Sequence, residues 1–176
     1  MIEGKNIQLR LFELDDAKTL FESMNNPKIA ENLEYQRYYS MEEEEEFIRQ
    51  SWQQAENNMG YFFAIIEKAS SEMVGSVTLS QINLVNNSAE LGIWIAEEFQ
   101  GVGFGEEAVR IVLNFGFNEL MLNSIKATVI DFNEKSRSLF AKVGMRETGK
   151  ERESVMRNGA YHDVIWFDML KKEFRE

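Results

Sequence analysis

The chain has 176 residues, of which 44% are apolar and 12% aromatic, a composition that argues for a buried core and against disorder. Its formal net charge of −11 disfavours nucleic acid, because phosphate binding needs clustered lysine and arginine, and it suits a cationic substrate or simply solubility. The absence of cysteine excludes disulfides, thiolate metal sites and a cysteine nucleophile, and the single histidine, His162, excludes a histidine-rich metal site.

Nothing in the sequence indicates a membrane or export segment. There is no run of about 18 apolar residues, and Met1 is not followed by a basic start and an apolar stretch. We therefore expect no membrane partner, no signal peptide and a cytoplasmic location. Neither an internal repeat nor a linker divides the sequence, so we expect one domain over residues 1–176.

The chain opens with one strand and two helices. Residues 7–11 alternate between apolar and polar side chains and predict a strand. Asp16 lies at the start of an apolar helical stripe, and Pro27 separates that helix from a shorter one ending near Leu33. Residues 34–39, which are rich in tyrosine, are expected to form a loop.

A third helix follows and carries an acidic run. Ser40 and Glu43 have the spacing of a capping box, so the helix should begin there and end near Asn57. The carboxylates of residues 42–46 then complement the positive end of the helix dipole. We prefer this structural explanation of the run to a substrate site.

The remainder of the chain is mostly strands. Apolar alternation predicts strands at residues 61–67, 73–84, 89–96 and 125–130, helices at about 104–119 and 134–143, and a hairpin of residues 145–156 and 161–170. Asn158 and Gly159 form the turn of that hairpin, and Gly144 caps the preceding helix. The order of elements predicts a mixed α/β fold in which antiparallel strands precede one strand–helix–strand crossover.

A cluster of glycines lies between the strand at 89–96 and the helix after it. The segment reads Gln100-Gly101-Val102-Gly103-Phe104-Gly105. Glycines let backbone N–H groups approach an anion without obstruction by a Cβ atom, and the start of a helix adds free donors and a positive dipole end. The segment therefore predicts a phosphate site.

Two other interpretations of this turn remain open. Residues 103–108 match the Gly-x-Gly-x-x-Ala fingerprint of dinucleotide-binding folds, and Asp131 lies near the expected distance. Only 45 residues follow Asp131, which is too few for a complete doubly wound domain. The segment could also be a tight turn that binds no ligand.

The glycine segment resembles the signature of the GNAT N-acetyltransferase superfamily, in which glutamine or arginine precedes spaced glycines. The strand at residues 89–95 resembles the central strand of that family, and residues 133–145 resemble its Asn-x-x-Ser…Lys-x-Gly-Phe helix. Leu9-Arg10, Asp16-Ala17 and the ending at residues 158–164 resemble the RimJ/RimL branch. The resemblance implies a mostly antiparallel sheet with a central splayed pair of parallel strands, flanked by helices.

The resemblance also implies a binding site for acetyl-CoA as cosubstrate, without a metal. Acetyl-CoA would lie between the strands at 89–96 and 125–131. Its binding residues would be Ile93, Trp94 and Ile95 through backbone N–H groups, Gln100, Gly101, Val102, Gly103, Phe104 and Gly105 around the pyrophosphate, and Asn133 and Ser136 along the pantetheine arm. Asn133 could equally serve as a helix cap.

The implied reaction is direct attack of a neutral primary amine on the thioester. Glu90 occupies the strand position where the family often carries a glutamate, and it is the candidate general base. Burial beside apolar strands would raise its pKa toward a useful range. The competing interpretation makes Glu90 a strand-edge carboxylate paired with a cation. The acceptor would be a small-molecule or peptide amine, such as a polyamine or a protein N-terminus.

One residue departs from the family pattern. Phe140 stands where many relatives carry a tyrosine general acid, and Tyr161 or a tyrosine at 35, 38 or 39 could replace it. The departure motivates a rival hypothesis, a non-catalytic acyl-CoA-binding module. His162 is expected to be a packing or surface residue, and the C-terminal hairpin offers an edge for a homodimer.

Overall fold

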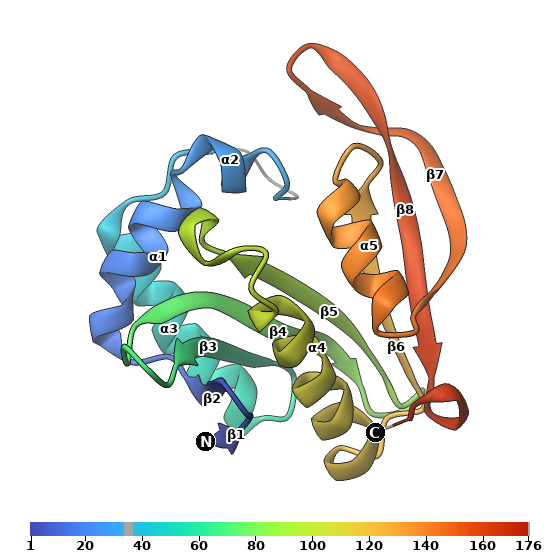
Figure 1. Ribbon diagram of the computed structural model, residues 1–176, viewed down its shortest axis with the longest axis horizontal. Helices are drawn as coiled ribbons and strands as arrows, with labels where there is room; N and C mark the ends of the chain where they lie inside the picture. The colour runs from blue at the N-terminus through green and yellow to red at the C-terminus, as the bar shows by residue number, and fades with distance from the viewer. Residues whose placement is uncertain (34–36, 176) are drawn as a thin grey trace.

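The computed structural model describes residues 1–33 and 37–175 of the chain, and Figure 1 shows its architecture. Eight strands within these residues form one sheet in the order β1-β2-β3-β4-β5-β6-β8-β7. The strands are β1 (Ile2–Glu3), β2 (Ile7–Leu11), β3 (Tyr61–Glu67), β4 (Met73–Asn83), β5 (Ser88–Ile95), β6 (Ser124–Ile130), β7 (Arg146–Arg157) and β8 (Ala160–Leu170). All neighbours pair antiparallel except β5 and β6, which are parallel.

This topology confirms the expected mixed α/β sheet and overturns the dinucleotide interpretation. A doubly wound domain is built from successive parallel strand–helix units, whereas one pair alone is parallel within the described sheet. Asp131, the acidic residue of that interpretation, bonds instead to His162 and to the backbone of Asp163.

Helices cover both faces of the sheet. They are α1 (Ala17–Met24), α2 (Pro27–Ala30), α3 (Met41–Glu56), α4 (Phe104–Asn114) and α5 (Glu134–Lys142). A π-helical turn at Phe115–Glu119 extends α4, and neither this turn nor β1 was predicted. The loop predicted at 34–39 includes residues 34–36, which lie outside the described residues.

Side-chain alternation along the strands assigns each residue to one of two faces. On β5, Ala89 and Leu91 are buried and belong to the main core with Ala108 and Val112 of α4 and Phe140 of α5. This face of the sheet, against α4 and α5, is called the helix-α4 face below. The residues between them on β5 point to the opposite face.

The opposite face, called the helix-α3 face, is packed by α1 and α3. Its cluster of buried side chains joins Leu20 of α1 and Ile48 of α3 to Ala64 and Ile66 of β3. Trp94 is the member of that cluster from β5, and no residue of β6 or β8 belongs to it in the described part of the chain. The helices of this layer therefore leave the β6–β8 half of the face uncovered.

Strands β5 and β6 separate soon after they begin. They pair at three positions, Ser88 with Ser124, Ala89 with Ile125 and Glu90 with Lys126. From there β5 continues to Ile95 beside β4, and β6 continues beside β8. The splayed parallel pair implied by the family resemblance is therefore present, and its apex lies at the Glu90–Lys126 rung.

The β7–β8 hairpin extends beyond the rest of the sheet and past α5, as Figure 1 shows. Near its tip, the guanidinium of buried Arg157 donates from Nε to the carbonyl oxygen of Glu31 at 3.1 Å and from a terminal nitrogen to that of Leu33. The tip is thereby bonded to the segment after α2, more than 120 residues away in sequence.

Candidate active site

The glycine turn has the backbone geometry of an anion site. Gly101 and Gly103 have φ of +81° and +100°, a region that side chains with a Cβ atom rarely adopt, and Gly103 is the N-cap of α4. A Cβ atom at either glycine would meet nothing within 4 Å, so the space in front of the turn is open. The first N–H groups of α4 face this space without partners inside the helix.

The other residues of the turn anchor it. Phe104 is buried in the main core, whereas the side chain of Val102 is exposed. A Cβ atom at Gly105 would lie 3.5 Å from Leu139 and 3.6 Å from Ile95, which is ordinary contact. The contribution of residues 101–105 to a ligand would therefore come from their backbone.

Gln100 links the two arms of the splay. Its side-chain nitrogen donates to the carbonyl oxygen of Ile95 at 2.9 Å, and its side-chain oxygen accepts from Lys135 Nζ at 2.8 Å. Lys135 belongs to the first turn of α5, so the glycine turn lies beside an exposed cation. The sequence analysis missed Lys135 because a lone surface lysine carries no spacing signal.

The hydrogen-bond ladder decides which β5 backbone groups face the splay. Ala96 N donates to Val74 O at 2.9 Å, so N–H groups two residues apart point toward β4. Trp94 shares that direction, and the N–H groups of Ile93 and Ile95 point the other way, into the splay. Of the three predicted backbone donors, those of Ile93 and Ile95 therefore face the splay, and that of Trp94 does not.

Glu90 lies at the apex of the splay, on the helix-α3 face. It is half-buried, which differs from the expected burial beside apolar strands, because the apolar residues Ala89 and Leu91 point to the other face. Across the sheet it is in register with Ser80, Lys126 and, through Lys126, with Asp168. A cation thus occupies the neighbouring strand, as the competing interpretation of Glu90 expected, although its Nζ lies over the Trp166 ring, 4.9 Å from the centroid.

Asn133 and Ser136 lie at the start of α5, across the splay from the glycine turn. The Asn133 side chain accepts from Ser136 N at 3.1 Å, which makes it the N-cap of α5. The predicted capping role is confirmed. A role toward pantetheine remains a prediction. The side-chain oxygen of Asn133 is used in the cap, and its side-chain NH2 group is the donor that could serve this role.

The candidates for a general acid are dispersed. Phe140 is buried against Phe167, with ring centroids 5.8 Å apart, so it belongs to the core. Tyr38 and Tyr161 are exposed, and Tyr35 lies outside the described residues.

The His162 side chain makes two defined contacts, with a carboxylate and with an aromatic ring. Its Nδ1 lies 3.0 Å from Asp131 Oδ1, and its ring meets Phe132 edge to face at 4.8 Å. The second oxygen of Asp131 accepts from Asp163 N at 3.1 Å. This group lies just beyond the end of β6, far from the splay apex.

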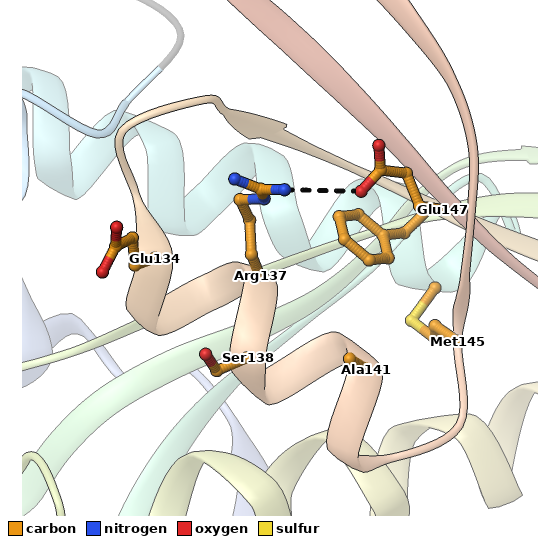
Figure 2. A pocket seen from close by; sticks show the side chains of 7 residues that line it. Glu134, Arg137, Ser138, Ala141, Met145 and Glu147 are labelled. Atoms are coloured by element: carbon orange, nitrogen blue, oxygen red, sulfur yellow. Dashed lines mark ion pairs between the residues drawn. The ribbon is translucent and has the colours of Figure 1, made fainter.

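A shallow pocket of about 420 Å³ lies between α5 and β7, outside the splay. Figure 2 shows its lining residues, with the Arg137–Glu147 ion pair of 3.5 Å across it. No residue of the glycine turn lines it. This pocket is therefore not the site that the glycine turn predicts.

None of the helices in the described part of the chain is long and apolar enough to cross a membrane. Within residues 1–33 and 37–175, no three histidine or acidic side chains are grouped as metal ligands.

Comparison with known proteins gives consistent matches over almost the whole chain. A family model described as an acetyltransferase (GNAT) domain matches residues 6–146. The Bacillus subtilis protein named "Putative ribosomal N-acetyltransferase YdaF" is 31% identical over 174 residues, which are 97% of this chain and 94% of that protein. Spermidine N(1)-acetyltransferase of Vibrio cholerae is 30% identical over 97% of this chain and 96% of its own length.

Solved structures agree with these matches. The crystal structure of spermidine N-acetyltransferase from Vibrio cholerae in complex with CoA and spermine has a TM-score of 0.87. It is 30% identical, and the match covers 96% of this chain and 97% of that one. The splayed sheet and its helices are therefore an arrangement found in a CoA-bound protein.

Proposed function

The chain belongs to the GNAT acetyltransferase family, and from this premise we propose that it transfers the acetyl group of acetyl-CoA to a primary amine with Glu90 as general base. As a GNAT N-acetyltransferase it uses acetyl-CoA as cosubstrate. We assign this activity to one domain that comprises residues 1–176.

The observation that carries the proposal is the arrangement around the splay. The glycine turn lies at the open end of β5, and Glu90 lies at the apex, where β5 and β6 part. Five residues of strand separate Glu90 from Ile95, which is roughly 17 Å. An extended pantetheine arm that starts at a pyrophosphate on residues 101–105 can follow this length of strand to the apex.

The residues of this chain would divide the chemistry as follows. N–H groups of the turn and of α4 bind the pyrophosphate, with Lys135 contributing positive charge beside Gln100. Glu90 removes a proton from the acceptor ammonium, directly or through a water molecule. The resulting neutral amine attacks the thioester carbon, and the oxyanion is stabilised by the N–H group of Ile93, which lies nearer to Glu90 than that of Ile95.

A general acid is not required for the last step. The bond to sulfur breaks as the carbonyl re-forms, and the leaving thiolate belongs to a thiol with a pKa of about 8.5. Such a group leaves without prior protonation far more readily than an alkoxide or an amide. Phe140 is therefore compatible with catalysis.

The acceptor class is suggested by charge and by the relatives. The net charge of −11 favours a cationic acceptor, and three of the relatives are named for spermidine. The YdaF name points instead to ribosomal protein. We place polyamines first, because the helix-α3 face carries the carboxylates of Glu90 at the splay apex and of Asp168 on β8, on either side of Lys126.

The proposal is tested by release of free CoA thiol from acetyl-CoA in the presence of spermidine, n-butylamine and alanine-initiated peptides. The wild-type protein should turn over at least one of them. Glu90→Gln should lower kcat by about 10²–10⁴, the usual contribution of a general base. Glu98→Gln, an exposed carboxylate just after β5, serves as the control and should retain full activity.

The same experiment separates the rival hypothesis of a non-catalytic acyl-CoA-binding module, which buried Phe140 motivates. Tight acetyl-CoA binding by calorimetry with no thiol release on any amine would favour the rival. A fully active Glu90→Gln protein would leave acetyl transfer intact and remove Glu90 from the mechanism.

A further inference from the structure

Glu44 differs from the other carboxylates of the acidic run on α3. It is 4% exposed, and its Oε1 atom has no hydrogen-bond partner among the residues that the structure describes. Glu43 accepts from Ser40 N at 2.8 Å and from Arg37 at 2.6 Å. Glu45 and Glu46 accept from residues one turn later on α3. The predicted structural role of the acidic run therefore explains why Glu43, Glu45 and Glu46 are there. It does not explain why a carboxylate is buried at position 44.

The side chain of Glu44 faces the inside of the molecule. Helical spacing places it on one stripe with Met41, Ile48 and Ser51, of which Ile48 and Ser51 are buried. Met41 and Ile48 belong to the cluster on the helix-α3 face, together with Trp94 of β5. Glu44 thus lies in the layer between α3 and the sheet, on the same face as Glu90.

The position relates Glu44 to the proposed reaction site. Trp94 and Glu90 share a face of β5 and are four residues apart, roughly 13 Å along the strand. Because the cluster packed by α3 includes Trp94, the two carboxylates lie on one side of the sheet. The start of α3 is held there because Asn25, just after α1, exchanges two hydrogen bonds of 2.9 Å with the Tyr39 backbone.

The environment of Glu44 penalises its negative charge. Burial is the main cause that raises the pKa of Glu44 to about 7, Arg37 lowers it in part, and Glu43 raises it further. At the other end of this layer, Arg10 is bonded to Asp16 at 2.6 Å, so those charges compensate each other. A buried carboxylate without a partner is costly, and a ligand cation would remove that cost.

We propose that Glu44 binds a second, non-reacting ammonium group of the acceptor, so that the preferred acceptors are diamines and polyamines. The inference rests on the proposed function for the role of the first amine. An ammonium group supplies the positive charge and the hydrogen bond that Glu44 Oε1 lacks. Because Glu90 lies on β5 and Glu44 on α3, an acceptor that reaches both must carry two separated amines.

Binding of a cation at Glu44 has a thermodynamic signature that other carboxylates do not share. At pH 6 the Glu44 carboxyl is mostly protonated, so an ammonium ligand must displace its proton. At pH 8 it is mostly ionised, and little proton is displaced. Glu43, Arg37 and Arg10 keep their charge between these pH values, because the pKa of the Glu43 carboxyl is lowered by Arg37 and the pKa values of both guanidinium groups are raised by their carboxylate partners.

The test is calorimetric titration of the full-length protein with spermidine, and with n-butylamine as the monoamine control, in two buffers of different ionisation enthalpy. We expect release of close to one proton per spermidine at pH 6, less at pH 8, and at least tenfold weaker binding of n-butylamine. Glu44→Gln should lose the pH-dependent release and bind spermidine at least tenfold more weakly. Glu45→Gln, its exposed neighbour, should behave as the wild type.

Equal proton release and equal spermidine affinity in the wild type and in Glu44→Gln would overturn the inference. If the variant fails to fold, the wild-type comparison of pH 6 with pH 8 decides alone, because release that does not depend on pH excludes Glu44. Thiol release is independent of this result. If the enzyme releases thiol but Glu44→Gln binds spermidine as the wild type does, only this inference is refuted. If spermidine binding releases protons as expected but no thiol is released, only the proposed reaction is refuted.

Discussion

At the scale of single residues, glutamates with identical chemistry take different roles because of their surroundings. Glu90 lies half-buried at the splay apex, where an acceptor amine can reach it, and Glu43 caps a helix in solvent. Glu44 is enclosed beside apolar side chains and bears the cost of an ionised carboxylate. A single substitution can measure that cost.

Glu44→Gln should stabilise the fold above neutral pH. The folded-state pKa of about 7 exceeds the ordinary 4.5, so the folded protein holds the proton longer, and its free energy of unfolding falls as pH rises from about 4.5 to about 7. The Gln side chain of the variant is neutral, so at pH 8 the variant avoids this fall in the free energy of unfolding. The gain is up to roughly 3 kcal/mol, at 1.36 kcal/mol per pKa unit. Urea unfolding at pH 5 and pH 8 checks it, and a gain that is equal at both pH values would contradict the account.

The residues that sequence analysis found are those with a fixed spacing. Gln100, Gly101 and Gly103 were predicted from one short segment, and Asn133 from the start of the helix after the next strand. Lys135 and Glu44 were missed, because the partner of a lysine and the burial of a glutamate depend on packing between distant segments. The burial expected for Glu90 was too high for the same reason.

At the scale of elements, the glycine turn concentrates the binding function. Its backbone has positive φ at Gly101 and Gly103, which glycine adopts without strain, and it leads directly into α4. Strand β5 before it and helix α4 after it were predicted, since strands and helices with strong periodicity are visible in sequence, whereas the short 3-10 helix at Glu97–Phe99 was not. The π-helical turn at Phe115–Glu119 was not, because it follows α4 without a change in the apolar pattern.

Gly103→Ala should lower the affinity for acetyl-CoA at least tenfold, which corresponds to about 1.4 kcal/mol. At a φ of +100° a Cβ atom is strained, and relief of the strain would turn the N–H groups away from the pyrophosphate. Gly159→Ala is the matched control, because Gly159 has a φ of +80° and equally open space but lies in the hairpin turn. Calorimetry with acetyl-CoA measures both, and an equal loss in both variants would argue against the site.

At the scale of the whole molecule, segments far apart in the sequence are joined near the hairpin tip. The segment after α2 and the β7–β8 hairpin are joined through Arg157 and two backbone carbonyl oxygens. On the other side, Lys28 of α2 is paired with Glu97, just after β5. Contacts of this kind bring α2, the end of β5 and the hairpin tip together around the open end of the splay.

Arg157→Ala should loosen this junction and leave the sheet intact. Hydrogen bonds to a charged group are worth about 1.5–3 kcal/mol each, so their loss should raise hydrogen exchange in residues 29–33 and 155–161. Acetyl-CoA affinity should stay within twofold, and the KM for spermidine should rise. Arg152→Ala, an exposed arginine of the same hairpin, is the control, and unchanged exchange in Arg157→Ala would contradict the role of the junction.

The strand order could be predicted only in part. The element order argued against a doubly wound domain, which the single parallel strand pair of the described sheet then overturned, and the splay followed from family resemblance. The junction at Arg157 could not be predicted, because no local pattern in the sequence links residues 31–33 to 157. Long-range pairing of this kind depends on the complete topology.

A crystal structure of the protein with CoA would test the location of the cosubstrate most directly. The pyrophosphate oxygens should accept hydrogen bonds from N–H groups of Gly101 to Gly105, and the thiol should lie between β5 and β6 near the Glu90–Lys126 rung. CoA bound elsewhere, for example in the pocket between α5 and β7, with an empty splay would contradict the assignment.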